Sequence, residues 1–99
     1  MQLIKKYVES IEEEIEGAKE YAEKYVEAKV KGDMQKASKL KEMANDELKH
    51  ASYIHGWAVK EIDELSKVYT PPADMQEKWD KAHKEYVEKV SWIKQMLEM

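Results

Sequence analysis

The chain has 99 residues, of which 38% are charged, and its formal net charge at pH 7 is −4. This length makes one domain near the lower end of the common range, so size alone makes a partner subunit plausible. Acidic and basic residues are interspersed without a basic run, which argues against nucleic acid as a partner. Because cysteine is absent, disulfides, iron–sulfur clusters and thiol catalysis are excluded, and any metal must bind to carboxylates and imidazoles.

The sequence shows neither a signal peptide nor a long uncharged apolar run. We therefore expect a cytoplasmic protein without a membrane partner.

Residues 2–31 carry the pattern of an amphipathic helix. Their apolar residues recur every three or four positions, at Ile4, Tyr7, Val8, Ile11, Ile15, Ala18, Tyr21, Ala22 and Tyr25. Gly32 is expected to stop this helix, and Asp33 to cap the next one.

Residues 34–69 predict a second helix. One apolar stripe consists of Ala37, Leu40, Ala44, Leu48, Ala51, Ile54, Ala58, Ile62 and Leu65. A second edge carries Met43, His50 and Trp57 at intervals of seven. Two such edges indicate two neighbours, so this helix is predicted to be the central one. Pro71 and Pro72 should end it, because the residue before a proline is pushed out of the α region.

Residues 73–97 predict a third helix, with a stripe at Met75, Trp79, Ala82, His83, Tyr86, Val90, Ile93 and Leu97. Both connections are short, so successive helices should be antiparallel neighbours. The sequence thus indicates an all-α protein in which residues 1–99 form a single helical domain.

Two acidic residues interrupt the apolar stripes. Glu14 lies seven residues after Tyr7 and seven before Tyr21, in the middle of the face that should be buried. Glu47 takes the equivalent place on the second stripe, seven residues after Leu40. A lone buried carboxylate costs several kcal/mol unless something compensates it. The two interruptions therefore call for a shared explanation.

The positions of these residues along the hairpin suggest a metal site. Glu14 lies about 27 Å before the turn at Gly32, and Glu47 and His50 lie roughly 22 to 27 Å after it, at helical rise. Antiparallel packing brings all three to one level. Glu47 and His50, at i and i+3, project from neighbouring parts of one helix face. Carboxylates with one imidazole suit iron or manganese.

The motifs resemble those of the ferritin-like superfamily, in which a Glu from one helix and a Glu-x-x-His from another are each supplied twice. Glu14-x6-Tyr21 looks like the first-helix motif of bacterioferritins and rubrerythrins, and Asp46–Ala51 (DELKHA) looks like their second-helix motif. The two glutamates are 33 residues apart, close to the separation in those families. The resemblance covers residues 11–57, about half of the chain.

One chain offers only three of the six ligands of a full bundle, because it has no fourth helix and the linker Thr70–Pro72 is too short for a crossover. Encapsulated ferritins, which this chain resembles most, complete the set by dimerisation. The resemblance implies an antiparallel ferritin-like hairpin plus a third C-terminal helix, forming a four-helix bundle as a homodimer or larger homo-oligomer. It also implies an encapsulin-type shell as a partner, although Gln95–Met99 does not look like the Gly/Ser-linked tag of that family.

The same resemblance implies ferroxidase activity at a di-iron site between subunits, for iron storage or oxidative protection. Glu14 would bind one iron terminally, Glu47 would bridge two irons and His50 would bind as neutral imidazole. The matching tyrosine in the family, here Tyr21, hydrogen-bonds a bridging carboxylate. The resemblance implies secondary roles for further residues: iron passage for Glu13 and Glu16, and orientation of a partner histidine for Asp46.

Alternatives remain open at this stage. The buried acids can instead pair with lysines in a non-catalytic helical interaction module, or the site can use manganese. Tyr7, Tyr25 and Trp57 are most simply core aromatics. Asp80 and His83 repeat the carboxylate–imidazole spacing, but no second acid lies on their stripe, so a structural role is favoured.

Overall fold

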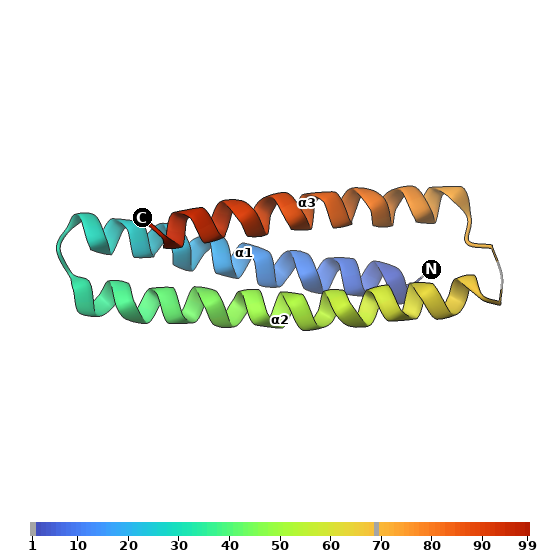
Figure 1. The fold of residues 1–99 in the computed structure, drawn as a ribbon, viewed down its shortest axis with the longest axis horizontal. Helices are drawn as coiled ribbons and strands as arrows, with labels where there is room; N and C mark the ends of the chain where they lie inside the picture. Colours follow the sequence, from blue (N-terminus) through green and yellow to red (C-terminus); the bar gives the residue numbers. More distant parts are fainter. Residues whose placement is uncertain (1, 69) are drawn as a thin grey trace.

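The fold was analysed in a computed structural model, which describes residues 2–68 and 70–99. This part of the chain forms three helices and no strand: α1 (Gln2–Val30), α2 (Met34–Ser66) and α3 (Ala73–Leu97). They run side by side in alternating directions and make a rod 55 Å long and 18 by 17 Å across (Figure 1). The predicted all-helical class is confirmed.

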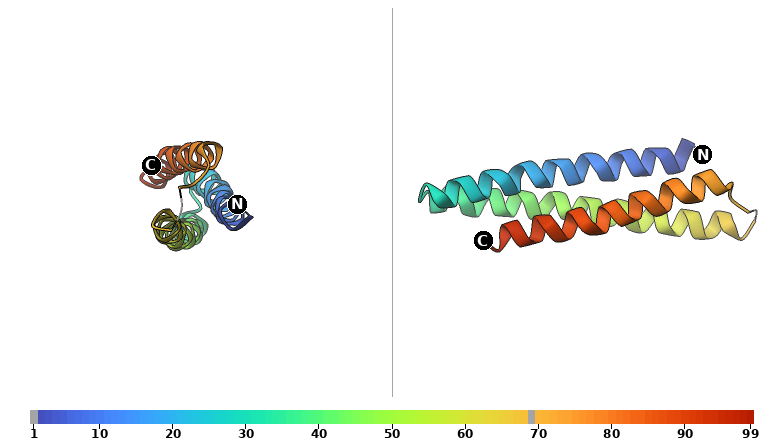
Figure 2. Two further views of the ribbon diagram at one scale, coloured as in Figure 1. Left: turned by 90° about the vertical axis from the view of Figure 1, so that its right-hand side faces the viewer. Right: turned by 90° about the horizontal axis from the view of Figure 1, so that it is seen from above.

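The central helix is α1, not α2 as the sequence pattern predicted. Both α2 and α3 pack along α1, whereas the backbones of α2 and α3 hardly approach each other. Viewed end-on, the three helices lie at the corners of a triangle (Figure 2, left). The apolar face of α1 is wide enough for two neighbours, and the second edge of α2 points outward.

Small side chains line the contact between α1 and α2. Ala18, Ala22, Ala44, Ala51 and Ala58 are all fully buried. Because alanine has no side chain beyond Cβ, the two backbones can approach closely. Larger residues fill the rest of the core: Ile4, Ile11, Ile15, Tyr25, Leu40, Leu48, Met75, Trp79, Ile93 and Leu97.

The turn between α1 and α2 forms as the sequence predicted. Gly32 adopts a positive φ of 79°, which only glycine tolerates easily. The amides of Gly32 and Asp33 donate to the carbonyls of Lys29 (3.0 Å) and Ala28 (2.9 Å), which satisfies the last carbonyls of α1. Asp33 then accepts a hydrogen bond from the Lys36 amide at 3.1 Å and caps α2.

The end of α2 comes earlier than predicted. The helix ends at Ser66, a turn follows at 67–68, and residue 69, the predicted end, lies outside the described residues. The Ser66 hydroxyl donates to the carbonyls of Ile62 and Asp63, each at 2.9 Å, and the last amides shift to tighter i−3 partners. The bounds of α3 agree with the prediction.

The chain end returns to α1. Lys29 Nζ donates to the backbone carbonyl of Met99 at 2.7 Å, next to the α1–α2 turn. No helix within residues 2–68 and 70–99 combines the length and the apolar character needed to cross a lipid bilayer.

Candidate metal centre

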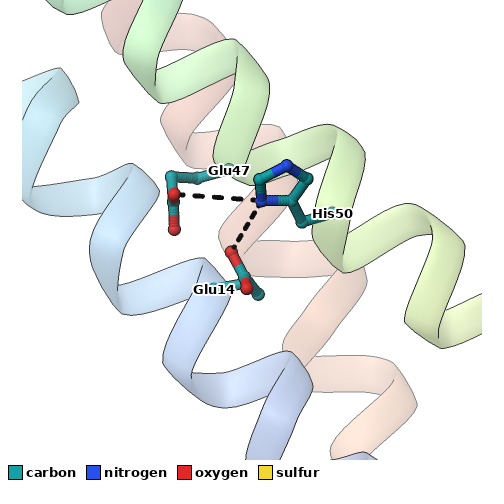
Figure 3. Close-up of side chains that lie close together, drawn as sticks. All are labelled: Glu14, Glu47 and His50. Carbon is teal, nitrogen blue, oxygen red and sulfur yellow. Dashed lines mark hydrogen bonds and ion pairs between the residues drawn. The ribbon is translucent and has the colours of Figure 1, made fainter.

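Three side chains from two helices converge on one point of the rod. Glu14 comes from α1, and Glu47 and His50 come from α2 (Figure 3). Each offers a ligand atom, and these atoms all lie within 4.8 Å of one another. It is the only group of this kind in the part of the chain that the structure describes. The antiparallel packing of α1 and α2 thus brings together the residues that the sequence predicted at one level.

The imidazole of His50 faces both carboxylates through one nitrogen. Nδ1 lies 3.3 Å from Oε2 of Glu14 and 3.9 Å from Oε1 of Glu47. The glutamate side chains are 27% exposed, whereas that of His50 is 54% exposed. The carboxylates therefore form the floor of the site and the imidazole forms its outer edge.

These separations fit the binding of a single ion. Metal–oxygen and metal–nitrogen bonds of about 2.0 to 2.2 Å place two ligand atoms of one ion between about 3 and 4.3 Å apart, depending on the angle. Both distances from His50 Nδ1 lie in this range. Hard oxygens with one borderline nitrogen suit divalent iron or manganese. With three protein ligands, further coordination positions stay open.

The electrostatics of the site also favour a cation. The pKa of Glu47 is raised, first by a hydrogen bond shared with the Glu14 carboxyl, then by burial and by the negative charge of Glu14. The charge of His50 acts in the opposite direction. Two carboxylates held this close repel each other when both are ionised, and a bound cation would remove that repulsion.

Gly17 is a residue of this site that the sequence analysis missed. A Cβ atom added at Gly17 would lie 2.7 Å from Oε2 of Glu47 and 3.4 Å from its Cδ. The Glu47 side chain therefore lies directly on the backbone of α1. The available sequence signal was a glycine one turn after Glu14 inside a helix, where glycine is unfavourable.

The secondary residues do not join the group. Glu13 and Glu16 are exposed and line a shallow hollow with Glu12 and Lys89, apart from the triad. Asp46 is exposed, and its negative charge helps to raise the pKa of Glu47.

Tyr21 is half-buried on α1, one heptad after Glu14. Among the described residues, no hydrogen bond joins its hydroxyl to the triad. Its role as a hydrogen-bond donor to a bridging carboxylate stays a prediction.

A separate pair of histidines, His55 and His83, joins α2 to α3. His55 Nε2 lies 2.8 Å from His83 Nδ1, and the His55 ring stacks on Tyr86 with 4.4 Å between centroids and on Trp79 with 5.7 Å. Burial lowers the pKa of His55, and the charge of His83 lowers it further. Asp80 instead accepts a hydrogen bond from the side-chain amide of Gln76, with 2.9 Å between Nε2 and Oδ1. The cluster is a packing contact between the two helices.

The outer edge of α2 continues on the face that carries the triad. Trp57, expected in the core, is instead 58% exposed, and Met43 is 37% exposed, because α3 packs on α1 and leaves this edge without a neighbour. Tyr25 is buried and Tyr7 is half-buried, as expected for core aromatics. In Figure 3 the ribbon of α3 passes behind α1 and α2, and the three side chains of the triad lie in front of it.

Comparisons with protein-family models, curated proteins and solved structures find no match to this chain.

Proposed function

We propose that the protein is a ferritin-like di-iron ferroxidase whose active site forms between two copies of the chain. The observation that carries this proposal is the convergence of Glu14, Glu47 and His50 at distances suited to one ion. Two of these residues interrupt apolar stripes, and metal binding would explain why partly buried carboxylates are kept there. The triad also has the residue types and helix order of the ferritin-like motif.

A second copy is proposed because the triad is half of a di-iron ligand set. It opens on the face of α1 and α2 that α3 leaves bare, beside the exposed Met43 and Trp57. A two-fold axis through this face would set two hairpins against each other as a four-helix bundle, with both α3 helices outside. The exposed apolar side chains would be buried in that interface.

In this assembly each residue has a defined task. Glu14 binds one ion as a terminal ligand, Glu47 provides two oxygens that bridge neighbouring ions, and His50 binds through Nδ1, the nitrogen that faces both carboxylates. The substrate is Fe(II), which two adjacent sites hold close together with open positions for the oxidant. Dioxygen or peroxide accepts the electrons. The product serves iron storage or protection from oxidative damage.

Aerobic oxidation of Fe(II) tests the proposal. Wild-type protein should accelerate oxidation, and Glu14→Ala, Glu47→Ala and His50→Ala should each lower the rate by about tenfold or more. The matched controls are Glu20→Ala on α1 and Glu64→Ala on α2, both exposed and outside the triad. Wild-type protein that binds no metal, or Glu47→Ala that oxidises iron as fast as wild type, would refute it.

A metal titration separates metal binding from iron oxidation. Anaerobic titration with Fe(II) and with Mn(II) should show binding of both ions to wild type. A protein that binds both but does not oxidise Fe(II) would be a metal-binding protein rather than a ferroxidase. A protein that binds neither would favour a non-catalytic helical interaction module.

A further inference from the structure

Gly17 lies on α1 directly against the Glu47 side chain of the candidate metal site. It lies three residues after Glu14, hence on the neighbouring part of the same helix face. The three atoms nearest to a Cβ built at this position all belong to Glu47, with Oε2 at 2.7 Å, Cδ at 3.4 Å and Cγ at 3.7 Å. Real Cβ atoms essentially never come within 3.0 Å of a heavy atom outside their own residue and its chain neighbours. Any side chain at position 17 would therefore displace the Glu47 carboxylate.

Neither of the other two glycines makes room for a side chain. Gly32 has a positive φ and forms the turn, whereas Gly56 lies within α2 with nothing within 4 Å of a built Cβ. Glycine inside a helix is unfavourable relative to alanine, because it loses more backbone freedom on folding. At Gly17, in contrast to Gly56, the structure supplies a reason to accept that cost: it makes room for a carboxylate.

The two oxygens of Glu47 are used differently. Oε1 faces the imidazole of His50 at 3.9 Å, whereas Oε2 lies over Gly17. A Cβ at position 17 would lie only 2.7 Å from Oε2 and force it to move, and because the carboxylate is rigid, Oε1 would move as well. Glu47 is long and flexible, so it would rotate toward solvent rather than push the helices apart.

We propose that Gly17 is the positioning residue of the metal centre: by lacking a side chain, it lets the Glu47 carboxylate lie across the α1–α2 interface with Oε1 toward His50 and Oε2 against the α1 backbone. The inference rests on the proposed function, because it makes the bridging position of Glu47 depend on the absence of a side chain at Gly17. It extends that function to a residue that binds no metal itself.

The test compares Gly17→Ala with Gly56→Ala. Both substitutions remove a helical glycine, so both apo proteins should melt at or above the wild-type temperature, by up to roughly 8 °C. Only Gly17→Ala should weaken the binding of Mn(II), measured by anaerobic titration, by about tenfold or more. A gain in thermal stability together with a loss of metal affinity is a result that a purely structural glycine would not give.

A second measurement needs neither metal nor variant. In the NMR spectrum of apo wild type, the Gly17 α-protons and the Glu47 γ-protons should show a nuclear Overhauser effect. Absence of this effect would overturn the inference even if Gly17→Ala failed to fold. Equal Mn(II) affinity in Gly17→Ala and wild type, or equal weakening in Gly56→Ala, would also overturn it and leave the metal site standing. Wild type that binds neither Mn(II) nor Fe(II) would refute the proposed function and, with it, the role of Gly17.

Discussion

The carboxylates of the triad lower the stability of the folded chain when both are ionised. Glu14 and Glu47 are each about three-quarters buried and face each other across two helices. Without a cation, their proximity raises the pKa of Glu47, so the folded chain holds a proton more tightly there than the unfolded chain does. The ionised form of Glu47 is therefore a cost to the apo protein at neutral pH.

Glu47→Gln should raise the stability of the apo protein near neutral pH. A raised pKa means that the contribution of Glu47 is fully present below its ordinary pKa of 4.5 and is lost as the pH rises through the folded-state value. The advantage of the amide should thus be clear at about pH 7.5 and vanish near pH 4. Thermal melts at the two pH values measure it, with Glu64→Gln as the control. A variant less stable than wild type at both pH values would contradict this account.

Residue patterns were sufficient to predict the triad but not its surroundings. Glu14 and Glu47 stood out because each interrupts a heptad stripe. They also lie at similar distances along the chain from the turn at Gly32, so antiparallel helices place them at the same level. Gly17 could not be identified in this way, because its role depends on where the Glu47 side chain of α2 lies on α1. The pairing of His55 with His83 depends likewise on the relative placement of α2 and α3, which the local pattern leaves open.

At the level of helices, buried alanines at the contact between α1 and α2 let the two helices pack closely. A larger side chain there would force the backbones apart, at a cost of typically 1 to 3 kcal/mol. Ala51→Leu should therefore lower the free energy of unfolding by about 1 to 3 kcal/mol, because Ala51 is fully buried. Ser52→Leu is the control, since this neighbouring residue lies on the exposed side of α2. Denaturant unfolding that gives equal stabilities for the two variants would contradict a close α1–α2 contact.

The contact between α2 and α3 should weaken in acid. The pKa of His55 is lowered, so its stabilising contribution is fully present above the ordinary value of 6.5 and is lost as the pH falls through the folded-state value. His83 and Tyr86 face it from α3, and Glu12, Glu85 and Lys89 line the small cavity beside it. The melting temperature should drop between about pH 7.5 and pH 5.

His55→Phe keeps an aromatic ring to stack on Trp79 and Tyr86 but cannot be protonated. This variant should lose much of the acid sensitivity of wild type over the same pH range. If its melting temperature falls as steeply as that of wild type, the acid sensitivity arises elsewhere.

Helix periodicity predicted the elements well and their mutual arrangement less well. Gly32 and Asp33 marked the first turn correctly, because a positive φ and a side-chain cap are local properties. The central helix was assigned wrongly. Two apolar edges on α2 indicate two surfaces that can pack against a neighbour, but they do not show whether both neighbours belong to the same chain. The edge at Trp57 is the one that neither α1 nor α3 covers.

For the whole molecule, the proposed dimer makes a prediction about two equally exposed tryptophans. Trp57 lies on the outer edge of α2 and is 58% exposed, whereas Trp92 lies on α3 and is 59% exposed. Trp57→Glu should weaken self-association by about tenfold or more, because it places a charge in the proposed interface. Trp92→Glu should leave it unchanged. Sedimentation analysis of the two variants measures this, and equal effects would argue against the face that carries the triad.

The most direct test of the central claim is a crystal structure of the protein soaked anaerobically with Fe(II), with the ions located by anomalous scattering. We predict two ions about 3.5 to 4 Å apart between two copies of the chain, bound by Glu14, Glu47 and His50 of both. An empty triad, or ions bound within a single chain with no second copy facing them, would contradict the claim.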